Sequence, residues 1–265
     1  MPWLAGGSLV ALAIFVALLY LESRPANGLE GRAPVRLYCA ASLRPVMEAI
    51  RAEYLRETGE RVEMEYGDSG RLLGQLELRP DVGLFLPADD SYVRLAEEKG
   101  LIAQSIPLCR MQAVLLCRPG KDVASLADLI KPGLRLGIAN PDRAAIGKVV
   151  RDHLVRQGKW EALAARIDVQ HFNVSEAANA VELGSRDATF VWDVVALNYP
   201  NLTTVRLAEL EGAIGRVELA ILRGRPDAAA RFAHYVASSD RGLSFLRKSG
   251  FTQVADGKPW PGGEP

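Results

Sequence analysis

The sequence predicts an α/β protein folded into two lobes, each with a mostly parallel sheet covered by helices. Two observations predict this class. Short apolar runs alternate with amphipathic stretches, which is typical of parallel strands joined by helices, and the alternation starts again after residues 107–120. The chain of 265 residues is 49% hydrophobic, so it can bury a sizeable core.

The first half of this pattern predicts three strand–helix units. The apolar run at 35–41 predicts a buried strand, and the helix that follows over 44–59 has apolar residues on one face and ends at Gly59. The remaining strands of this half are expected at 61–67 and 81–88, and its remaining helices at 69–78 and 89–100.

The second half repeats the same order of elements. Its strands are expected at 133–139 and 166–172, and its helices at 142–158 and 174–184. The apolar run at 188–197 predicts a strand that continues into the next segment. A further strand is expected at 217–224, and residues 226–251 predict two helices separated by a polar Ser-Ser-Asp turn.

The charge of the chain is balanced. Lys and Arg together number 32, as do Asp and Glu, so the formal net charge is zero. Because no net field draws such a chain to a polyanion, we expect no nucleic-acid partner. A small anion can still be held locally by directed hydrogen bonds.

Neither a metal centre nor a catalytic centre is expected. The three histidines, His153, His171 and His234, are scattered, and no His/Cys spacing typical of a metal site occurs. No nucleophile–base pair can be assembled, so we expect a binding protein without a cofactor and not an enzyme. Cys109 and Cys117 lie about 26 Å apart along one predicted strand, too far for a disulfide, and are expected to pack in the core.

The N-terminal segment is directed to a membrane. Residues 3–20 contain no charged side chain, and their length is close to the roughly 20 apolar residues that cross a bilayer as a helix. Almost no positive charge precedes this run and no clear cleavage site follows it. We therefore expect residues 1–24 to be a transmembrane anchor or an uncleaved signal. The remaining chain would then lie in the periplasm or another extracytoplasmic space, anchored to the inner membrane.

Two serines follow successive predicted strands. Ser42 comes after the strand at 35–41, and Ser69 lies between Gly67 and Gly70 after the next strand. In an open α/β sheet, ligands collect at the carboxyl ends of strands, where hydroxyls and the free N–H groups of helix starts can hold an anion. Two unrelated N-caps are the alternative interpretation. In the second half, the helix start at 144–147 and the one near Val174 offer main-chain N–H groups.

Five segments, in this order and spacing, resemble the periplasmic molybdate-binding proteins of ABC transporters. They are CAASLRPVMEAI (39–50), YGDSGRLLGQL (66–76), DVGLFLPADDSYV (81–93), IANPDRAAIGK (138–148) and DATFVWDVVA (187–196). The resemblance covers about residues 35–253 and implies a type II periplasmic-binding fold with the ligand in the cleft between two lobes. On this basis we place lobe I at 33–111 plus 217–256 and lobe II at 112–216, with crossing strands near 109–117 and 213–221.

The resemblance also implies a site in which hydroxyls and main-chain N–H groups hold a tetrahedral oxyanion, without a metal cation. Carried over by position, the hydroxyls belong to Ser42 and Ser69, and the main-chain donors to Ile146 and Val174. Trp192 stands where the family often has a tyrosine hydroxyl, and its indole N–H would donate from a different place.

Asp68 is the second departure from the family, which usually has a small neutral residue there. A carboxylate near a dianion costs about 1 kcal/mol in water-like surroundings and several at an effective dielectric of about 20. Either Asp68 points outward, paired with Arg44 or Arg71, or the ligand is not molybdate; we expect the outward orientation. Asp68 and Ala41 are therefore assigned as modulators of the site.

The sequence thus favours an extracytoplasmic, monomeric solute-binding protein that captures molybdate or tungstate and delivers it to the membrane permease of an ABC importer. These two anions are nearly the same size, so both remain candidates. The alternative is a membrane-anchored sensory or interaction module that has the same fold and an altered or lost ligand.

Overall fold

The computed structural model describes residues 33–79, 81–224 and 227–255. The predicted anchor or signal at 1–24 lies outside these residues. Within the ranges that are described, no helix has the length and apolar character needed to cross a membrane.

Ten strands are present among the described residues. They are β1 (Val35–Ala40), β2 (Val62–Gly67), β3 (Leu84–Leu86), β4 (Ile102–Cys117), β5 (Leu136–Ala139), β6 (Ile167–His171), β7 (Ala188–Trp192), β8 (Thr203–Val205), β9 (Ile214–Leu222) and β10 (Gln253–Val254). The main path of the sheet has the order β2-β1-β3-β9-β4-β7-β5-β6, while β8 and β10 both pair with β4.

The helices alternate with these strands along the chain. They are α2 (Arg44–Thr58), α3 (Ser69–Leu76), α4 (Ser91–Glu98), α5 (Leu126–Ile130), α6 (Ala145–Arg156), α7 (Trp160–Ala164), α8 (Val174–Glu182), α9 (Asp193–Ala196), α10 (Asp227–Val236) and α11 (Gly242–Lys248), with the 3₁₀ turns η2 (Ala41–Leu43) and η3 (Ala208–Leu210). In α2, Pro45 lies in the first turn and Gly59, with φ 71°, ends the helix as predicted.

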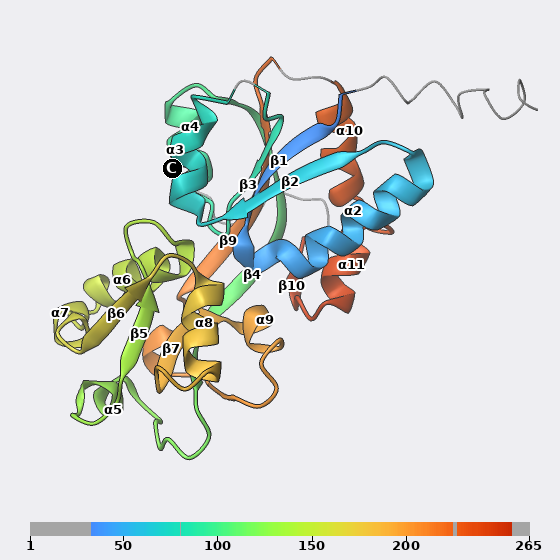
Figure 1. Cartoon of the computed structure of the whole chain (residues 1–265). Coiled ribbons are helices and arrows are strands. Elements are labelled where there is room, and N and C mark those ends of the chain that lie inside the picture. The colour runs from blue at the N-terminus through green and yellow to red at the C-terminus, as the bar shows by residue number, and fades with distance from the viewer. Residues whose placement is uncertain (1–32, 80, 225–226, 256–265) are drawn as a thin grey trace, which may run out of the picture.

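Two antiparallel strands, β4 and β9, connect the two groups of parallel strands. β4 pairs with β9 from Ile102 to Gln112 and with β7 from Ala113 to Cys117, while β9 also pairs with β3. We call β1–β3 with their helices α2, α3, α4, α10 and α11 the first half, and β5–β7 with α5–α9 the second half (Figure 1). The predicted lobe boundaries, 33–111 plus 217–256 and 112–216, stay a prediction.

Helices cover both faces of the sheet in the first half. Figure 1 shows α3 and α4 on one side of β1–β3 and α2, α10 and α11 on the other. The central strands β1 and β3 are largely buried and apolar, as expected for covered parallel strands: Leu37, Cys39 and Phe85 have no exposed surface. All three cysteines are buried and free, and Cys109 and Cys117 both lie in β4, as predicted.

One predicted strand is too long. The run at 188–197 was expected to continue as a strand, but β7 ends at Trp192 and Asp193 begins the short helix α9. The carboxylate of Asp193 accepts hydrogen bonds from the N–H groups of Val194 and Gln112, at 3.0 and 3.1 Å. These bonds stabilise a helix start, so the chain turns at Asp193 although the residues after it are apolar.

Gly147 fixes the position of α6 against the end of β5. A Cβ atom at this position would overlap the carbonyl oxygen of Ala139, the last residue of β5, and would also crowd Pro141. The first turn of α6 therefore lies directly against the carboxyl end of the strand. Gly74 in α3 is a matched contrast, since a Cβ atom there would meet nothing within 4 Å.

We expect Gly147→Ala to lower the free energy of unfolding by about 1–3 kcal/mol, because the added methyl group forces backbone to shift in a packed region. Gly74→Ala should raise stability by about 0.5–1 kcal/mol through the better helix propensity of alanine. Urea denaturation of the two variants measures both effects. Equal stability of the two variants would show that α6 is not held by this close contact.

Candidate functional site

The predicted site residues surround one small cavity between the two halves. Its volume is about 20 Å³, compared with roughly 10–15 Å³ for the space that one water molecule needs, so it admits only a compact group. It is lined by Ala40, Ala41, Ser42, Gly67, Asp68, Ser69, Ala88, Ala144, Ala145, Ile146, Asn173, Val174 and Trp192. All seven residues assigned from the sequence as ligands or modulators are in this set. Their role in binding stays a prediction.

Ser42 presents a buried hydroxyl with no partner. It lies in η2, directly after β1, and is 8% exposed. Among the described residues, no group makes a hydrogen bond with its Oγ. Buried polar atoms are almost always paired, so an unpaired one is unusual. This hydroxyl is free to donate to a group in the cavity. Ser42 is also not an N-cap, because Ala40 precedes η2 and Leu43 precedes α2.

Ser69 presents a second hydroxyl from the first turn of α3. The residue is 1% exposed, and its Oγ accepts a hydrogen bond from the N–H group of Ala88 at 3.2 Å. A hydroxyl that accepts one hydrogen bond still has its own hydrogen to donate. The cap of α3 is Asp68 and not Ser69. The alternative interpretation of the two serines as N-caps is therefore wrong.

Two helix starts of the second half contribute main-chain donors. Ile146 lies in the first turn of α6 and Val174 is the first residue of α8. First-turn N–H groups have no acceptor within their own helix, and the described residues provide none to either group. In α8 the cap Asn173 accepts from Glu176 at 3.0 Å and leaves Val174 unpaired. The positive ends of both helix dipoles therefore lie at the cavity.

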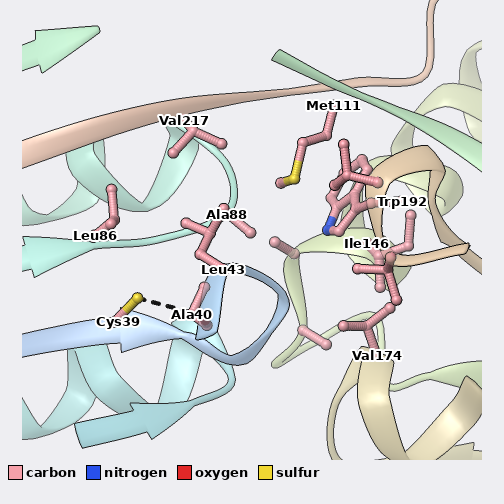
Figure 2. Packing of buried hydrophobic residues seen from close by; sticks show 14 of the residues in the cluster. Cys39, Ala40, Leu43, Leu86, Ala88, Met111, Ile146, Val174, Trp192 and Val217 are labelled. Atoms are coloured by element: carbon pink, nitrogen blue, oxygen red, sulfur yellow. Dashed lines mark hydrogen bonds between the residues drawn. The ribbon is translucent and has the colours of Figure 1, made fainter. Parts of the chain in front are cut away.

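Trp192 forms the wall opposite the first half. It ends β7 and is 1% exposed. Figure 2 shows Ile146 beside its ring and the side of the ring that carries the nitrogen turned toward Leu43 and Ala88. The ring fits because Gly215 in β9 has no side chain; a Cβ atom there would come within 2.7 Å of both the indole and the carbonyl oxygen of Ala88. The size of the cavity thus depends on this glycine as well as on Trp192.

Asp68 does not lie exposed on the outside of the site as predicted, but one of its two predicted partners, Arg71, does lie next to its carboxylate. Asp68 is only 6% exposed and lines the cavity. Its Oδ1 accepts from the N–H group of Arg71 at 2.7 Å, which caps α3. Its Oδ2 lies 3.4 Å from Nη2 of Arg143 and 3.8 Å from Nε of Arg71. Arg44 does not pair with it, because the Arg44 guanidinium stacks 4.4 Å above the ring of Tyr66.

A wider cleft opens next to the small cavity. It has a volume of about 410 Å³ and shares Ala41, Ser42, Gly67 and Asn173 with the cavity. Its outer wall is polar and includes Arg44, Tyr66, Asn179, Asn198 and Tyr199. The cavity is therefore the inner end of a cleft between η2 and α2 on one side and α8 and α9 on the other.

Sequence reasoning missed Asn173 and Arg143. The spacing of Asn173 and Glu176 before an apolar run is a capping signal that could have located the start of α8. Nothing local marks Arg143, because its contacts with Asp68, Gly70 and Tyr92 join distant parts of the chain.

Comparisons by sequence and by structure both find binding proteins that are similar to this chain. A family model described as bacterial extracellular solute-binding protein matches residues 35–252. The molybdate-binding protein ModA of Mycobacterium tuberculosis is 25% identical over 238 residues, which is 87% of this chain and 89% of the relative. A binding protein of Haemophilus influenzae is 28% identical over 161 residues, 60% of this chain and 66% of the relative. The structure of the periplasmic molybdate-binding protein of Azotobacter vinelandii has a TM-score of 0.72 at 18% identity and covers 85% of this chain and 100% of that chain, so it supports the fold.

The two serines should differ in their effect on stability without an anion. Ser69→Ala leaves the buried N–H group of Ala88 without its acceptor, which costs about 1–3 kcal/mol. Ser42→Ala removes a hydroxyl that has no partner, so we expect no loss and a gain of up to about 1 kcal/mol. Denaturant unfolding of the anion-free chain tests this. An equal loss in both variants would show that Ser42 is bonded within the protein.

Proposed function

The chain belongs to the bacterial extracellular solute-binding proteins, and we propose that it captures a tetrahedral oxyanion of the molybdate type for an ABC importer. The single observation that supports this best is the unpaired, buried hydroxyl of Ser42 in a cavity of about 20 Å³. A buried donor without a partner is costly, and a bound anion would provide the missing acceptor.

The other groups at the cavity complete a shell of donors. Ser69 has a free hydroxyl hydrogen, and the N–H groups of Ile146 and Val174 lie at helix starts, where anions are stabilised by N–H groups and by the helix dipole. Trp192 adds an indole N–H, which is a donor only. Donors come from both halves, so an anion would link the halves when the cleft closes. Because none of these donors is charged, the anion could also leave again at the permease.

The shell favours a fully deprotonated dianion. Both carboxylate oxygens of Asp68 already have partners, in the N–H group of Arg71 and the guanidinium of Arg143. A protonated oxyanion such as hydrogen phosphate would bring a hydroxyl that needs an acceptor, whereas the groups proposed for the shell would act as donors to the anion. Molybdate and tungstate carry no proton at neutral pH and are therefore preferred over phosphate.

The wider cleft favours a second candidate ligand. Its volume of about 410 Å³ lies within the 300–1,000 Å³ that is typical of small-molecule sites, and it joins the cavity at Ser42 and Gly67. The dianion of an ester, such as a phosphate monoester, could place its oxyanion in the cavity and its organic group in this cleft.

Thermal unfolding of the purified chain with millimolar molybdate, tungstate, sulfate, phosphate or glycerol 3-phosphate tests the proposal. An anion present at about a hundred times its Kd adds about 2.7 kcal/mol, which raises Tm by several degrees. We expect this shift for molybdate and tungstate, its loss in Ser42→Ala, and its persistence in the control Ser239→Ala, an exposed serine between α10 and α11.

The pattern of shifts decides between the candidates. A shift with the ester alone would replace molybdate by an organic oxyanion as the ligand. No shift with any of the five anions would contradict the proposal and would favour a sensory or interaction module whose ligand has been lost.

A further inference from the structure

Arg143 immediately precedes Ala144, which lines the cavity, and its guanidinium lies 3.4 Å from the carboxylate of Asp68. It contributes no donor that the family resemblance implies. We propose that Arg143 is a positioning residue: when the two halves close, its guanidinium offsets the charge of Asp68 and so allows the site to hold a dianion. This inference rests on the proposed binding of an oxyanion.

The side chain of Asp68 is too buried for water to screen its charge. It is 4% exposed, and a carboxylate among the residues that line the cavity would repel a dianion bound there. Its role as the cap of α3 holds it there, because Oδ1 bonds the N–H group of Arg71 at 2.7 Å. The position therefore requires a nearby positive charge if the cavity is to take a dianion.

Two arginines lie near this carboxylate, and one of them also pairs with a second acid. Arg71 is 3.8 Å from Oδ2 and bonds Glu65 at 3.0 Å, so its charge is shared with a second acid. Arg143 is 3.4 Å from Oδ2. Within the described part of the chain, Asp68 is the one carboxylate within salt-bridge distance of Arg143. Arg143 is therefore the principal counter-charge of Asp68.

The main chain of Arg143 is held on the first half independently of its charge. Its carbonyl oxygen accepts a hydrogen bond from the N–H group of Gly70 at 2.8 Å and from the hydroxyl of Tyr92 at 3.3 Å. The two backbones are so close that a Cβ atom at Gly70 would lie 2.9 Å from the same oxygen. On its own half, the Arg143 guanidinium stacks 5.3 Å from the ring of Phe172. The direction of the guanidinium is thus set from both halves.

The contact between Arg143 and Asp68 is linked to the position of the main-chain donor Ile146, because Arg143 lies three residues before it in the chain. Ala144 and Ala145 follow Arg143 directly and line the cavity, and Ile146 offers the main-chain donor of α6. Separating the halves would break the contact of Arg143 with Asp68 and withdraw the start of α6 in one movement. The dianion is therefore accepted only in the closed arrangement, in which the charge of Asp68 is balanced.

Four variants test this role: Arg143→Gln, Arg143→Lys, Asp68→Asn and the double variant Asp68→Asn/Arg143→Gln. Glutamine leaves the main-chain contacts of Arg143 intact, and asparagine caps a helix as well as aspartate does. The matched control is Arg56→Gln, which removes an exposed arginine that pairs with Glu53 on α2. The readout is the Kd for molybdate by titration calorimetry at low salt, with a thermal unfolding curve for each variant.

We expect Arg143→Gln to raise the Kd by roughly tenfold or more, because the charge of Asp68 is no longer offset. Asp68→Asn should lower the Kd, and the double variant should recover most of the affinity that Arg143→Gln loses. Arg143→Lys, which keeps the charge without the planar fork, should stay within about threefold of the wild type. Arg56→Gln should not change the Kd.

A double variant that binds as weakly as Arg143→Gln alone would overturn the inference, since Arg143 would then act on the anion itself or on folding. A loss in Arg143→Lys as large as in Arg143→Gln would do the same. A wild-type chain that binds no oxyanion would instead overturn the proposed function, and this inference with it.

Discussion

The pairing of β4 with β9 is the constraint on which the remaining structure depends. These two antiparallel strands extend through both halves, so they fix how the carboxyl ends of the parallel strands face one another. Each parallel strand that ends at the cavity is followed by a helix start, and a helix start has N–H groups without acceptors. The cavity is lined by donors because the strand order brings together the ends of β1, β2, β5 and β6, beside those of β3 and β7.

A site made of unpaired donors is unfavourable without its ligand. The hydroxyl of Ser42 and the first N–H groups of α6 and α8 would all be satisfied by a single acceptor group with several oxygen atoms. In proteins, the cost of such groups at a functional site is offset by stabilising interactions elsewhere. Here, large apolar side chains on β1, β3 and β4 are wholly buried. The apolar core thus supports a polar cavity that could not form by itself.

The order of elements and the positions of the two serines could be predicted because both depend on local patterns, whereas Ile146, Val174 and Trp192 were assigned to the candidate site from the family resemblance. Strand–helix alternation and the serines after β1 and β2 are visible in the sequence. The orientation of Asp68 was not predicted, because helix capping, a local hydrogen bond, outweighs the exposure expected for a lone carboxylate. Arg143 was missed because its partners in the first half lie 51 to 75 residues away. Asp193 ended a strand that apolar composition alone would have extended.

Gly215 limits how the width of the cavity can change. The indole of Trp192 lies where a side chain at residue 215 would be, so the ring is held between β9 and the cavity and cannot retreat from an entering group. Enlarging the cavity therefore requires a change at residue 192 itself, because most of the other wall residues are small and leave little to remove. Trp192 thus limits the width of the cavity, and the backbone of β9 at Gly215 packs against the other side of its ring.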